Sequence, residues 1–589
     1  MDLNWSLKEI YPSFESKEFK NDLLKLKEYI EDIKEFSIKI NNKDDILNAL
    51  EDYINLINNL NTIQYKLYSY VNLVTSVDTK DINGLKYTDI LDNMVSDIKG
   101  PEASVKRWIS NIDDIDSIIE KSILLKEHEF FIKEIVKESR YLLSENEEKI
   151  ISNMKNTGSK AFSKLKDTLI SSLMVDIEED GVETKFPLTV VLNMAYSEDK
   201  EIRKKGYEAE IKSYEKVEDG VAAALNGIKG EVITECTIRG YKSPLDMTLL
   251  HSRMDKKTLD AMLDAMKESM PKFREYLKRK ASILGYNNGL PFYEMYAPIS
   301  NTSMQFTYEE AGNFIIKNFN TFSKHLGEFA NRAIENNWID VMPKKGKVGG
   351  AFCHGLHFIG ESRILLNFGG QFGDVVTMAH ELGHGFHDEC LKNEVFLNSD
   401  YPMPIAETAS TFCETIIKKS AIKDATKDEA LYILENEISD STQVIVDIYS
   451  RFLFESNLFE KRKESSLSVD EIKELMINAQ KEAYGDGLDN EYLHPYMWAW
   501  KPHYYDADYN FYNFPYAFGL LFAKGLYAEY LKRKETFPSD YEKLLAYTGK
   551  ANLKDVAMTM GIDITSKEFW KSSLDIVIED INSFLELTK

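Results

Sequence analysis

Apolar side chains return every three or four positions along most of the chain, a spacing that predicts a mainly α-helical protein. Near the N-terminus this pattern predicts one amphipathic helix around residues 23–33 and a longer one over residues 46–74. Thr307 and Glu310 form a capping-box sequence, so another helix is expected to begin there. Because strand patterns are scarce, we expect a large helical body with only a small β-sheet.

The clearest strand candidates stand directly before one mostly apolar helix. Residues 351–358 and 363–368 are predicted to be the two strands of a hairpin around Gly360. A glycine-rich break follows, and Asp374 is a suitable N-cap for the helix after it. The sheet is therefore expected next to this helix.

The same helix carries the sequence His-Glu-Leu-Gly-His at residues 380–384. The spacing puts His380 and His384 on one helix face, about one turn apart, where both imidazoles can reach a single metal ion. Glu381 lies at the adjoining edge of that face, where its carboxylate can take a proton from a water at the metal. The alternative is a pair of histidines that are only hydrogen-bonded in a core. Because such groups are costly to bury unpaired, the pattern favours a metal site, with one Zn2+ per chain.

A catalytic zinc also needs a third protein ligand. The metzincin pattern requires glycine and histidine where this chain has His387 and Cys390, so that class is excluded. Residues 401–404, where thermolysin-like enzymes place a glutamate, contain no carboxylate. The first acid beyond them is Glu407, in the first turn of a helix expected to start near Ile405. Glu407 is therefore the predicted third ligand.

Other residues remain alternatives near this site. Three acids follow the histidines on the same helix and tend to point along it or away from the ion: Asp388, Glu389 and Glu394. Glu414 lies two turns after Glu407, about 10 Å further along the axis, too far to share the ion easily. We expect Glu414 to orient a ligand histidine, and an ordinary surface acid is the alternative. His387 is either a packing residue or a second partner of the site.

Composition restricts the partners and the compartment. The formal net charge of −25 would repel nucleic-acid phosphates, so no nucleic-acid partner is expected. Four scattered cysteines do not make a disulfide scaffold. Neither a secretory signal nor a membrane-spanning apolar stretch is found. We expect a soluble, cytoplasmic protein without a membrane partner, and its oligomeric state is open.

At 589 residues the chain is long enough for more than one domain. A weak boundary falls near residues 180–200, where acidic residues, a glycine and Pro187 interrupt the helical pattern. The short apolar run just before it, residues 173–175, fits either a helix or a strand. We expect an N-terminal helical region over residues 1–195 and a catalytic region over residues 196–589.

Several further motifs accompany the histidine helix in a fixed order. They are Trp5-Ser6-Leu7, Tyr11-Pro12-Ser13-Phe14, Phe292-Tyr293-Glu294-Met295-Tyr296-Ala297-Pro298, Lys347-Val348-Gly349-Gly350-Ala351-Phe352-Cys353, Glu407-Thr408-Ala409-Ser410, Trp500-Lys501-Pro502-His503-Tyr504-Tyr505 and Phe511-Tyr512-Asn513-Phe514-Pro515-Tyr516. As an ordered set they resemble the oligoendopeptidase F family, within the thimet-oligopeptidase group of zinc peptidases. The family more often has aspartate at the position of Glu294. The resemblance covers essentially the whole chain.

This resemblance implies a helical body that encloses a deep channel with zinc on its wall. It implies endopeptidase action on short, unstructured oligopeptides. It also implies an edge strand that binds the substrate backbone, which we expect at Gly349, Gly350, Ala351 and Phe352, near the strand before the histidine helix.

The downstream aromatic cluster is expected to stabilise the oxyanion that forms when water attacks a peptide carbonyl. A tyrosine hydroxyl or an imidazole N–H beside a zinc can donate to that oxygen. Tyr505, Tyr509, Tyr512 and Tyr516 recur at spacings of three and four, so one helical stripe could face the channel, although Pro515 interrupts the pattern. The resemblance implies His503 and one or two of Tyr509, Tyr512 and Tyr516 as the donors, and many of the 32 tyrosines are expected to be packing residues.

Two other functions fit part of the pattern. A zinc carboxypeptidase of similar build would need a cation to hold the substrate C-terminus, for which Arg363 or Lys347 are available. A protein that binds peptides without cutting them would lack Glu381 or a ligand, and all of these residues are present.

Overall fold

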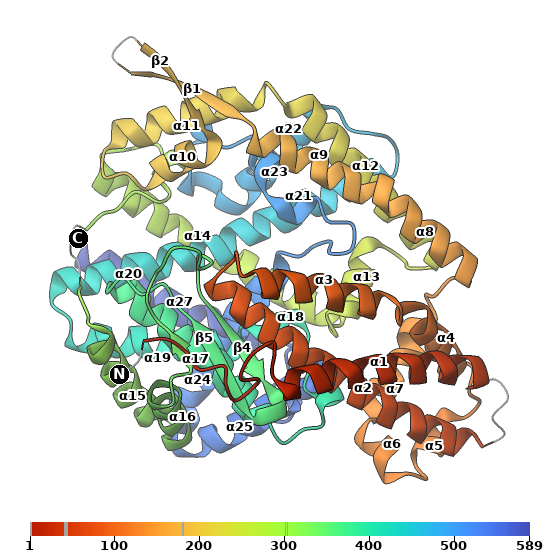
Figure 1. Ribbon diagram of the computed structural model, residues 1–589. Helices are drawn as coiled ribbons and strands as arrows, with labels where there is room; N and C mark the ends of the chain where they lie inside the picture. Colours follow the sequence, from red (N-terminus) through yellow and green to blue (C-terminus); the bar gives the residue numbers. More distant parts are fainter. Residues whose placement is uncertain (1–2, 41–44, 180–181, 301, 303) are drawn as a thin grey trace.

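The computed structural model describes residues 3–589 apart from residues 41–44, 180–181, 301 and 303. It confirms a mainly α-helical body with two small sheets (Figure 1). None of its helices is long and apolar enough to cross a membrane, within the part of the chain that is described.

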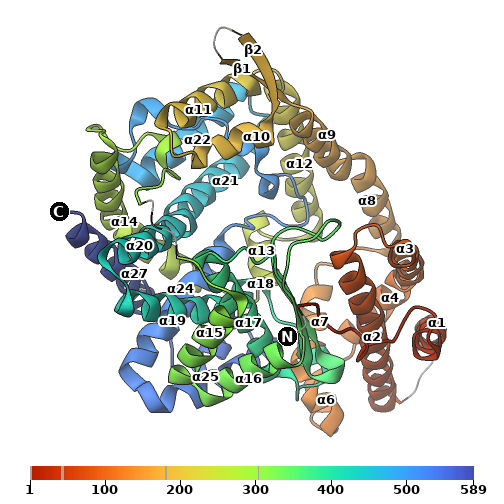
Figure 2. The same cartoon turned by 60° about the vertical axis from the view of Figure 1, so that its left-hand side comes forward.

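The first helices form the side of the molecule drawn in red and orange in both views (Figures 1 and 2). They are α1 (Lys17–Lys39), α2 (Ile46–Val77), α3 (Ile82–Ser96), α4 (Lys99–Ser110), α5 (Ile115–Ile119), α6 (Ile123–Glu127) and α7 (Glu129–Ser139). The helices α1 and α2 confirm the two amphipathic helices that the apolar spacing predicts.

The next segment adds helices and a hairpin that projects from the top of the molecule in both views (Figures 1 and 2). Its elements are α8 (Glu145–Thr157), α9 (Ser159–Ser171), β1 (Met174–Glu179), β2 (Val182–Pro187), α10 (Leu188–Asn193), η2 (Met194–Tyr196), α11 (Lys200–Tyr214), α12 (Glu218–Arg239), α13 (Pro244–His251), α14 (Lys256–Leu284) and η3 (Phe292–Glu294). The ambiguous run at residues 173–175 therefore leads into a strand.

The third segment contains the second sheet and the histidine helix. Its elements are α15 (Tyr308–Phe322), α16 (Lys324–Glu335), β3 (Ile339–Asp340), β4 (Phe352–Leu356), η4 (His357–Ile359), β5 (Glu361–Leu365), α17 (Phe372–Leu391), η5 (Phe396–Asn398), α18 (Met403–Ala406) and α19 (Thr408–Asp424). The predicted capping box is confirmed at the start of α15, where the Glu310 N–H donates to the Thr307 hydroxyl and Glu310 accepts from the Thr307 N–H.

The last segment is again helical. Its elements are α20 (Lys427–Thr442), the π-helical turn η6 (Gln443–Asp447), α21 (Ile448–Arg462), α22 (Val469–Tyr484), η7 (Gly485–Gly487), η8 (Asn490–Tyr492), α23 (Met497–Trp500), η9 (Pro502–Tyr504), α24 (Phe514–Arg533), η10 (Lys534–Thr536), α25 (Phe537–Tyr547), η11 (Thr548–Lys550), α26 (Leu553–Met558) and α27 (Lys567–Leu587). Helix α27 packs against α14, α20 and α24.

The buried apolar residues form two clusters. The smaller one contains residues from Trp5 to Ile135 together with Leu356 and Leu365 of the second sheet. The larger one begins at Leu173 and continues to the C-terminal helix. The N-terminal helices therefore have their own core and attach to the rest partly through the sheet, while the domain boundary at residue 195 stays a prediction.

The second sheet has the order β3-β5-β4, so β4 is an edge strand. Strand β5 pairs parallel with β3 and antiparallel with β4, and Gly360 turns the hairpin with a φ of +65°, a conformation that favours glycine. The predicted hairpin is confirmed, but the second strand is Glu361–Leu365 rather than residues 363–368. Beyond Leu365 the chain bonds to Asp340 of β3 and to Val341 directly after it, through the N–H groups of Leu366 and Phe368.

Helix α17 lies between this sheet and α19, and it contacts both. Its first residue is Phe372, so Asp374 is not the N-cap. Instead, Asp374 lies in the first turn and its carboxylate accepts from the backbone N–H groups of Gly369 and Gln371, at 3.0 and 2.9 Å. This carboxylate holds the glycine-rich break against the helix start.

A buried ion pair joins α11 to the Phe292–Glu294 turn. The Arg203 guanidinium donates to Glu294 at 2.6 and 2.9 Å, and the Tyr286 hydroxyl donates to the other carboxylate oxygen at 2.9 Å. Glu294 has no exposed surface. Its charge therefore depends on these partners.

We predict that Arg203→Leu lowers the free energy of unfolding by about 3–5 kcal/mol, because it leaves the Glu294 carboxylate buried without its cation. Lys204→Leu is the control, since Lys204 forms an exposed pair with Glu208 at 3.8 Å and lies 5.8 Å from the centre of the Tyr492 ring, and a change within about 0.5 kcal/mol is expected. Urea unfolding followed by circular dichroism measures both. Equal losses in the two variants would contradict the prediction.

Candidate functional site

Three donor atoms from two adjacent segments meet at one point. His380 and His384 come from α17, and Glu407 lies at the junction of α18 and α19. The two Nε2 atoms are 3.1 Å apart, and the Glu407 Oε2 lies 3.2 Å from His380 Nε2 and 3.4 Å from His384 Nε2. Among the described residues, this is the group whose donor atoms converge as metal ligands would.

The spacing of these atoms fits a zinc ion. Bonds of about 2.0–2.1 Å in a tetrahedral arrangement put any two ligand atoms about 3.3 Å apart. The three separations in this structure scatter closely around that value. The donor set of two imidazoles and one carboxylate is also one that zinc accepts.

A glycine inside the motif allows the two helices to come this close. A Cβ on Gly383 would lie 2.6 Å from the Ala409 carbonyl oxygen and from Ser410 Cα, so α19 packs directly on the backbone of α17. Helix α24 approaches from the other side, where a Cβ on Gly519 would lie 2.9 Å from the Glu407 Cβ. Glu407 is therefore fixed by backbone contacts, in addition to the hydrogen bond that it accepts from Ser410 at 2.8 Å.

Glu414 contacts the same histidine from its other side. Its Oε1 lies 2.5 Å from His380 Nδ1. Lys418 then bonds to both Glu414 and Glu437, at 2.9 and 2.7 Å, and Lys524 bonds to Glu437 at 2.6 Å. A chain of alternating charges thus extends from the imidazole into the core.

These neighbours set the charges around His380. Burial lowers its pKa, but Glu407 and Glu414 outweigh burial and raise the pKa to about 10. Burial likewise opposes ionisation of Glu414, but Lys418 and His380 hold its pKa at about 2. The two ionised carboxylates attract positive charge to this point, whether it is a proton or a metal cation.

Glu381 faces the same site but bonds to none of the described residues through its Oε2. It is 6% exposed, and burial raises its pKa, partly offset by His380 and His384. An unpaired carboxylate beside a ligand cluster is available to accept a proton.

A cavity of about 510 Å³ opens at these residues. It is lined by His380, Glu381 and Glu414, by Ala351 just before β4, and by residues of α20. Of the predicted substrate-binding residues, Ala351 lines this cavity. Phe352 is the first residue of β4, and Gly349 and Gly350 precede the strand.

His503 forms a separate ring cluster with Tyr512 and Tyr516, with ring centroids 5.7 and 6.2 Å away. Its Nδ1 is buried without a partner in the described chain. Burial, followed by the charges of nearby Arg451, Lys501 and Lys166, lowers the pKa of His503 to about 4, so the ring is neutral at pH 7. Burial, Tyr512 and the charge of Glu407 together raise the pKa of Tyr516 to about 12, which places this cluster within the electrostatic reach of the ligand site.

The tyrosines do not form the expected helical stripe. Tyr505 is buried in the core, Tyr509 is 62% exposed, and α24 begins only at Phe514. The segment before it is irregular, with Phe511 at a φ of +53°. The prediction of one helical stripe from the tyrosine spacing was therefore wrong. Pro515 lies in the first turn of α24 and does not interrupt a helix.

The alternative acids and His387 are engaged elsewhere. Glu389 bonds to Arg332 and Lys392, and Glu394 bonds to Lys550. Asp388 accepts from Ser362 at 3.2 Å. His387 stacks on Tyr401 and contacts the Thr548 hydroxyl, so it is a packing residue. Glu407 itself is not inside a helical turn as expected, because α18 ends at Ala406 and α19 starts at Thr408.

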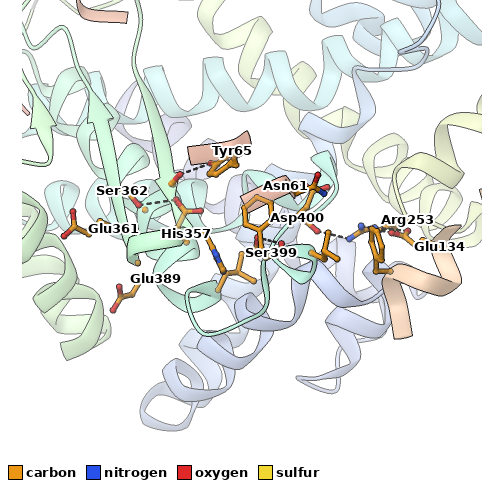
Figure 3. A pocket seen from close by; sticks show the side chains of 18 of the residues that line it. Asn61, Tyr65, Glu134, Arg253, His357, Glu361, Ser362, Glu389, Ser399 and Asp400 are labelled. Carbon is orange, nitrogen blue, oxygen red and sulfur yellow. Dashed lines mark hydrogen bonds and ion pairs between the residues drawn. The ribbon is translucent and has the colours of Figure 1, made fainter. Parts of the chain in front are cut away.

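A second cavity, of about 520 Å³, lies beyond the C-terminal half of the edge strand (Figure 3). Tyr65 of α2 donates to the Gly355 carbonyl at 2.7 Å, and Arg253 bonds to Glu134 of α7 at 2.7 Å. Figure 3 shows Tyr65 and Ser362 on one side of the cavity and the Arg253–Glu134 pair on the other. The N-terminal helices thus cover the far end of β4 and form a wall of this cavity.

Two contacts of the site escaped the sequence reasoning. Lys418 forms an ion pair with Glu414, and the Ser410 hydroxyl donates a hydrogen bond to Glu407. Their spacings of four and three residues from these acids are visible in the sequence, but equal spacings occur on many exposed helix surfaces. These two contacts differ from the exposed ones because they are buried, and burial can be seen only once the fold is known.

Neither cation suggested for a carboxypeptidase is free. Arg363 is fully buried and bonds to Glu9 and Glu361, while Lys347 bonds to Asp340 at 2.7 Å. Each has a structural role that leaves no charge for a substrate C-terminus.

Comparison with known families gives two matches. The model described as "Peptidase family M3" matches residues 193–576, and the model described as "Oligopeptidase F" matches residues 111–174. Together the two matches cover most of the chain, including the histidine helix and the aromatic cluster.

Named relatives and solved structures agree with these matches. Oligopeptidase PepF of Bacillus subtilis is 25% identical over 482 residues, covering 81% of this chain and 71% of its own length. The chromosomal oligoendopeptidase F of Lactococcus lactis subsp. cremoris is 26% identical over 396 residues, covering 67% and 65%. A crystal structure from Chlamydophila abortus aligns with a TM-score of 0.86 at 21% identity, over 99% of this chain and 98% of that one. The oligoendopeptidase F structure from Enterococcus faecium aligns with a TM-score of 0.72 at 16% identity, over 97% and 99%.

We predict that Gly383→Ala weakens both the fold and the ligand site. The added methyl group must push α19 away from α17, so a loss of about 1–3 kcal/mol in unfolding free energy is expected, with weaker zinc retention. Thermal unfolding and metal analysis after dialysis measure the two effects.

The matched control is Gly373→Ala in the first turn of the same helix. Nothing lies within 4 Å of a Cβ at Gly373, and alanine favours a helix over glycine by about 1 kcal/mol. A Gly383→Ala protein as stable and as metal-rich as Gly373→Ala would show that the helices tolerate separation.

Proposed function

The chain belongs to peptidase family M3 and is a metalloendopeptidase, and from this premise we propose that it uses zinc to cut internal bonds of short, unfolded oligopeptides. The observation that carries the proposal is the convergence of His380, His384 and Glu407 at zinc-ligand separations, with an unpaired Glu381 beside them.

The three residues would hold one Zn2+, with Glu414 orienting His380 through its Nδ1. Zinc bound there supplies Lewis-acid activation of water and of the substrate carbonyl. The carboxylate of Glu414 fixes the His380 tautomer, because it leaves Nδ1 as the donor and Nε2 as the lone pair that faces the ion. The buried cations behind Glu414 keep this carboxylate ionised.

Glu381 is the proposed general base. Its free oxygen accepts the proton of the attacking water and then delivers it to the leaving amine. Burial raises the pKa of Glu381, which makes its carboxylate a stronger base toward the attacking water.

His503 and Tyr516 are the proposed oxyanion donors, with Tyr512 packed against both rings. His503 is neutral near pH 7, so it donates one N–H without adding a charge. Donors of this kind contribute most when they are aimed at charge that develops only in the transition state. Tyr509 is the weakest candidate, because its side chain is mostly exposed.

The edge strand is the proposed holder of the substrate backbone. An extended peptide can pair with the free edge of β4 and with the residues Gly349 to Ala351 before it. Tyr65 already occupies the Gly355 carbonyl, so pairing would stop before that residue. Backbone pairing recognises main-chain groups, which gives wide tolerance of side chains and requires an unfolded substrate.

We predict that the purified protein holds about one zinc per chain and cuts a peptide blocked at both ends, which an exopeptidase cannot use. Glu381→Gln should keep the zinc and lose most turnover, since the amide does not accept the proton. His384→Ala should lose both. Mass spectrometry of the products and metal analysis of each variant provide the measurements.

Glu389→Gln is the control for this set, because Glu389 lies about two turns further along α17 and faces Arg332 and Lys392. It should keep zinc and near-normal turnover. A Glu381→Gln enzyme that still works normally, or a protein that holds no transition metal after zinc reconstitution, would refute the proposed chemistry.

We further predict that His503→Ala lowers kcat by about 10²–10³ with a smaller change in KM, because the lost donor acts on charge that appears only in the transition state. His251→Ala is the matched control: His251 lines the same cavity of about 580 Å³ from α13, and its loss should leave kcat unchanged. Steady-state kinetics on one blocked peptide compare the two. Normal kcat in His503→Ala would remove this residue from the mechanism.

A further inference from the structure

Next to the ligand site lies a smaller cavity, of about 310 Å³, whose walls combine aromatic rings with polar and charged side chains. We call it the Lys501 cavity. Its lining includes Tyr196, Tyr207, Phe292, Tyr296, Trp500 and Lys501. Aromatic walls with placed polar groups are typical of ligand pockets.

The Lys501 ammonium is the exceptional group in this cavity. It lies 4.1 Å from the centre of the Trp500 ring, and no ion pair or hydrogen bond of the described residues involves it. Its pKa is lowered to about 8, first by burial and then by the charge of Arg451. The charges of Asp447 and Glu210 offset this lowering only in part, since neither acid pairs with Lys501 directly. A desolvated cation without a direct ion pair is costly, and a bound anion would reduce that cost.

The charged neighbours of Lys501 are already engaged. Glu210 bonds to His494 at 3.0 Å and to the Tyr214 hydroxyl at 2.9 Å. Asp447 bonds to Arg451 at 2.5 Å. The other cation of the cavity, Arg203, is neutralised by Glu294. Lys501 therefore keeps its charge available to the cavity.

The Lys501 cavity adjoins the cavity of the ligand site along one helix. Asn436 and Asp440 of α20 line the ligand-site cavity, and Gln443, at the start of η6, lines the Lys501 cavity. Three residues of helix rise only about 4.5 Å. Burial and the charge of Asp440 both raise the pKa of Tyr196, another residue of the Lys501 cavity.

This proximity matches the reach of an extended peptide. Each extended residue advances about 3.3 Å, so a peptide held at His380, His384 and Glu407 reaches the next cavity within a few residues. We propose that Lys501 forms a subsite that binds a carboxylate of the substrate, either its C-terminus or the side chain of an aspartate or glutamate. The proposal rests on the peptidase function above and adds a preference that backbone pairing alone does not give.

The test uses matched peptides with the zinc-loaded full-length enzyme. One pair of N-acetylated octapeptides differs only in a free-acid or amidated C-terminus. A second set keeps the amide and exchanges glutamate for glutamine at each position in turn. For the acidic member that occupies the subsite, kcat/KM should exceed that of its neutral partner by roughly 10-fold or more, and Lys501→Met should abolish the difference.

Two variants serve as controls. Lys501→Arg keeps the charge and should keep the preference for the acidic peptide. Lys473→Met removes a lysine that also lies over a tyrosine ring, at 4.5 Å from the centre of the Tyr496 ring, but that is paired with Glu218. This variant should change kcat/KM for neither the acidic nor the neutral peptides, so it should cut the neutral peptides as wild type does. For the Lys501 variants the readout is the ratio of kcat/KM for the acidic and the neutral peptide, so a general change in turnover through His503 does not affect it.

A preference for the free acid assigns the subsite to the substrate C-terminus, and a preference for glutamate assigns it to a side chain. The proposal is overturned if wild type discriminates neither set, or if Lys501→Met keeps the discrimination. Peptide binding to the zinc-loaded Glu381→Gln variant, measured by fluorescence anisotropy, repeats the comparison without cleavage. A wild type that cuts no peptide would refute the proposed function, and the binding measurement would still decide the role of Lys501.

Discussion

The contact between α17 and α19 is the constraint on which the site depends. Because residue 383 is a glycine, the backbone of α19 packs directly on α17. Two acids therefore reach the imidazole of His380: one is the N-cap of α19 and the other lies inside α19. Glu407 approaches His380 at Nε2, and Glu414 approaches it at Nδ1. These acids are seven positions apart, about the distance needed for one carboxylate to contact each side of a single ring.

Bringing these acids into the interior requires compensating charge. Glu414 and Glu437 are both ionised and buried, and each would be strongly unfavourable alone. Lys418 and Lys524 alternate with them, so each of these four charges has a neighbour of opposite sign. The core behind the ligand histidine is therefore polar, yet its groups are bonded to one another. This arrangement resists movement of His380, since a shift of the ring would disturb several ion pairs at once.

The sequence predicted the parts of the site that depend on local geometry. A helix of 3.6 residues per turn is sufficient to align His380 with His384, and an apolar spacing is sufficient to find α1 and α2. The failures occur where distant segments decide the outcome. The second hairpin strand ends at Leu365, and the chain after it bonds to Asp340 and Val341, which lie far away in the sequence. The tyrosine spacing was misleading because residues 505–513 are irregular. The pairing state of Lys501 was also unpredictable, since its neighbours come from helices far away in the sequence.

The position of β4 has a consequence for the behaviour of the protein in a concentrated solution. An exposed edge strand is a site where two copies of a protein can join their sheets and aggregate. Here α2 covers part of that edge through Tyr65, and His354 contacts Ser69 of the same helix. The remainder lies beside the ligand-site cavity. A single flexible chain can enter such a space, whereas the edge of another folded sheet cannot, so the walls that would admit a peptide also protect the enzyme from its own copies.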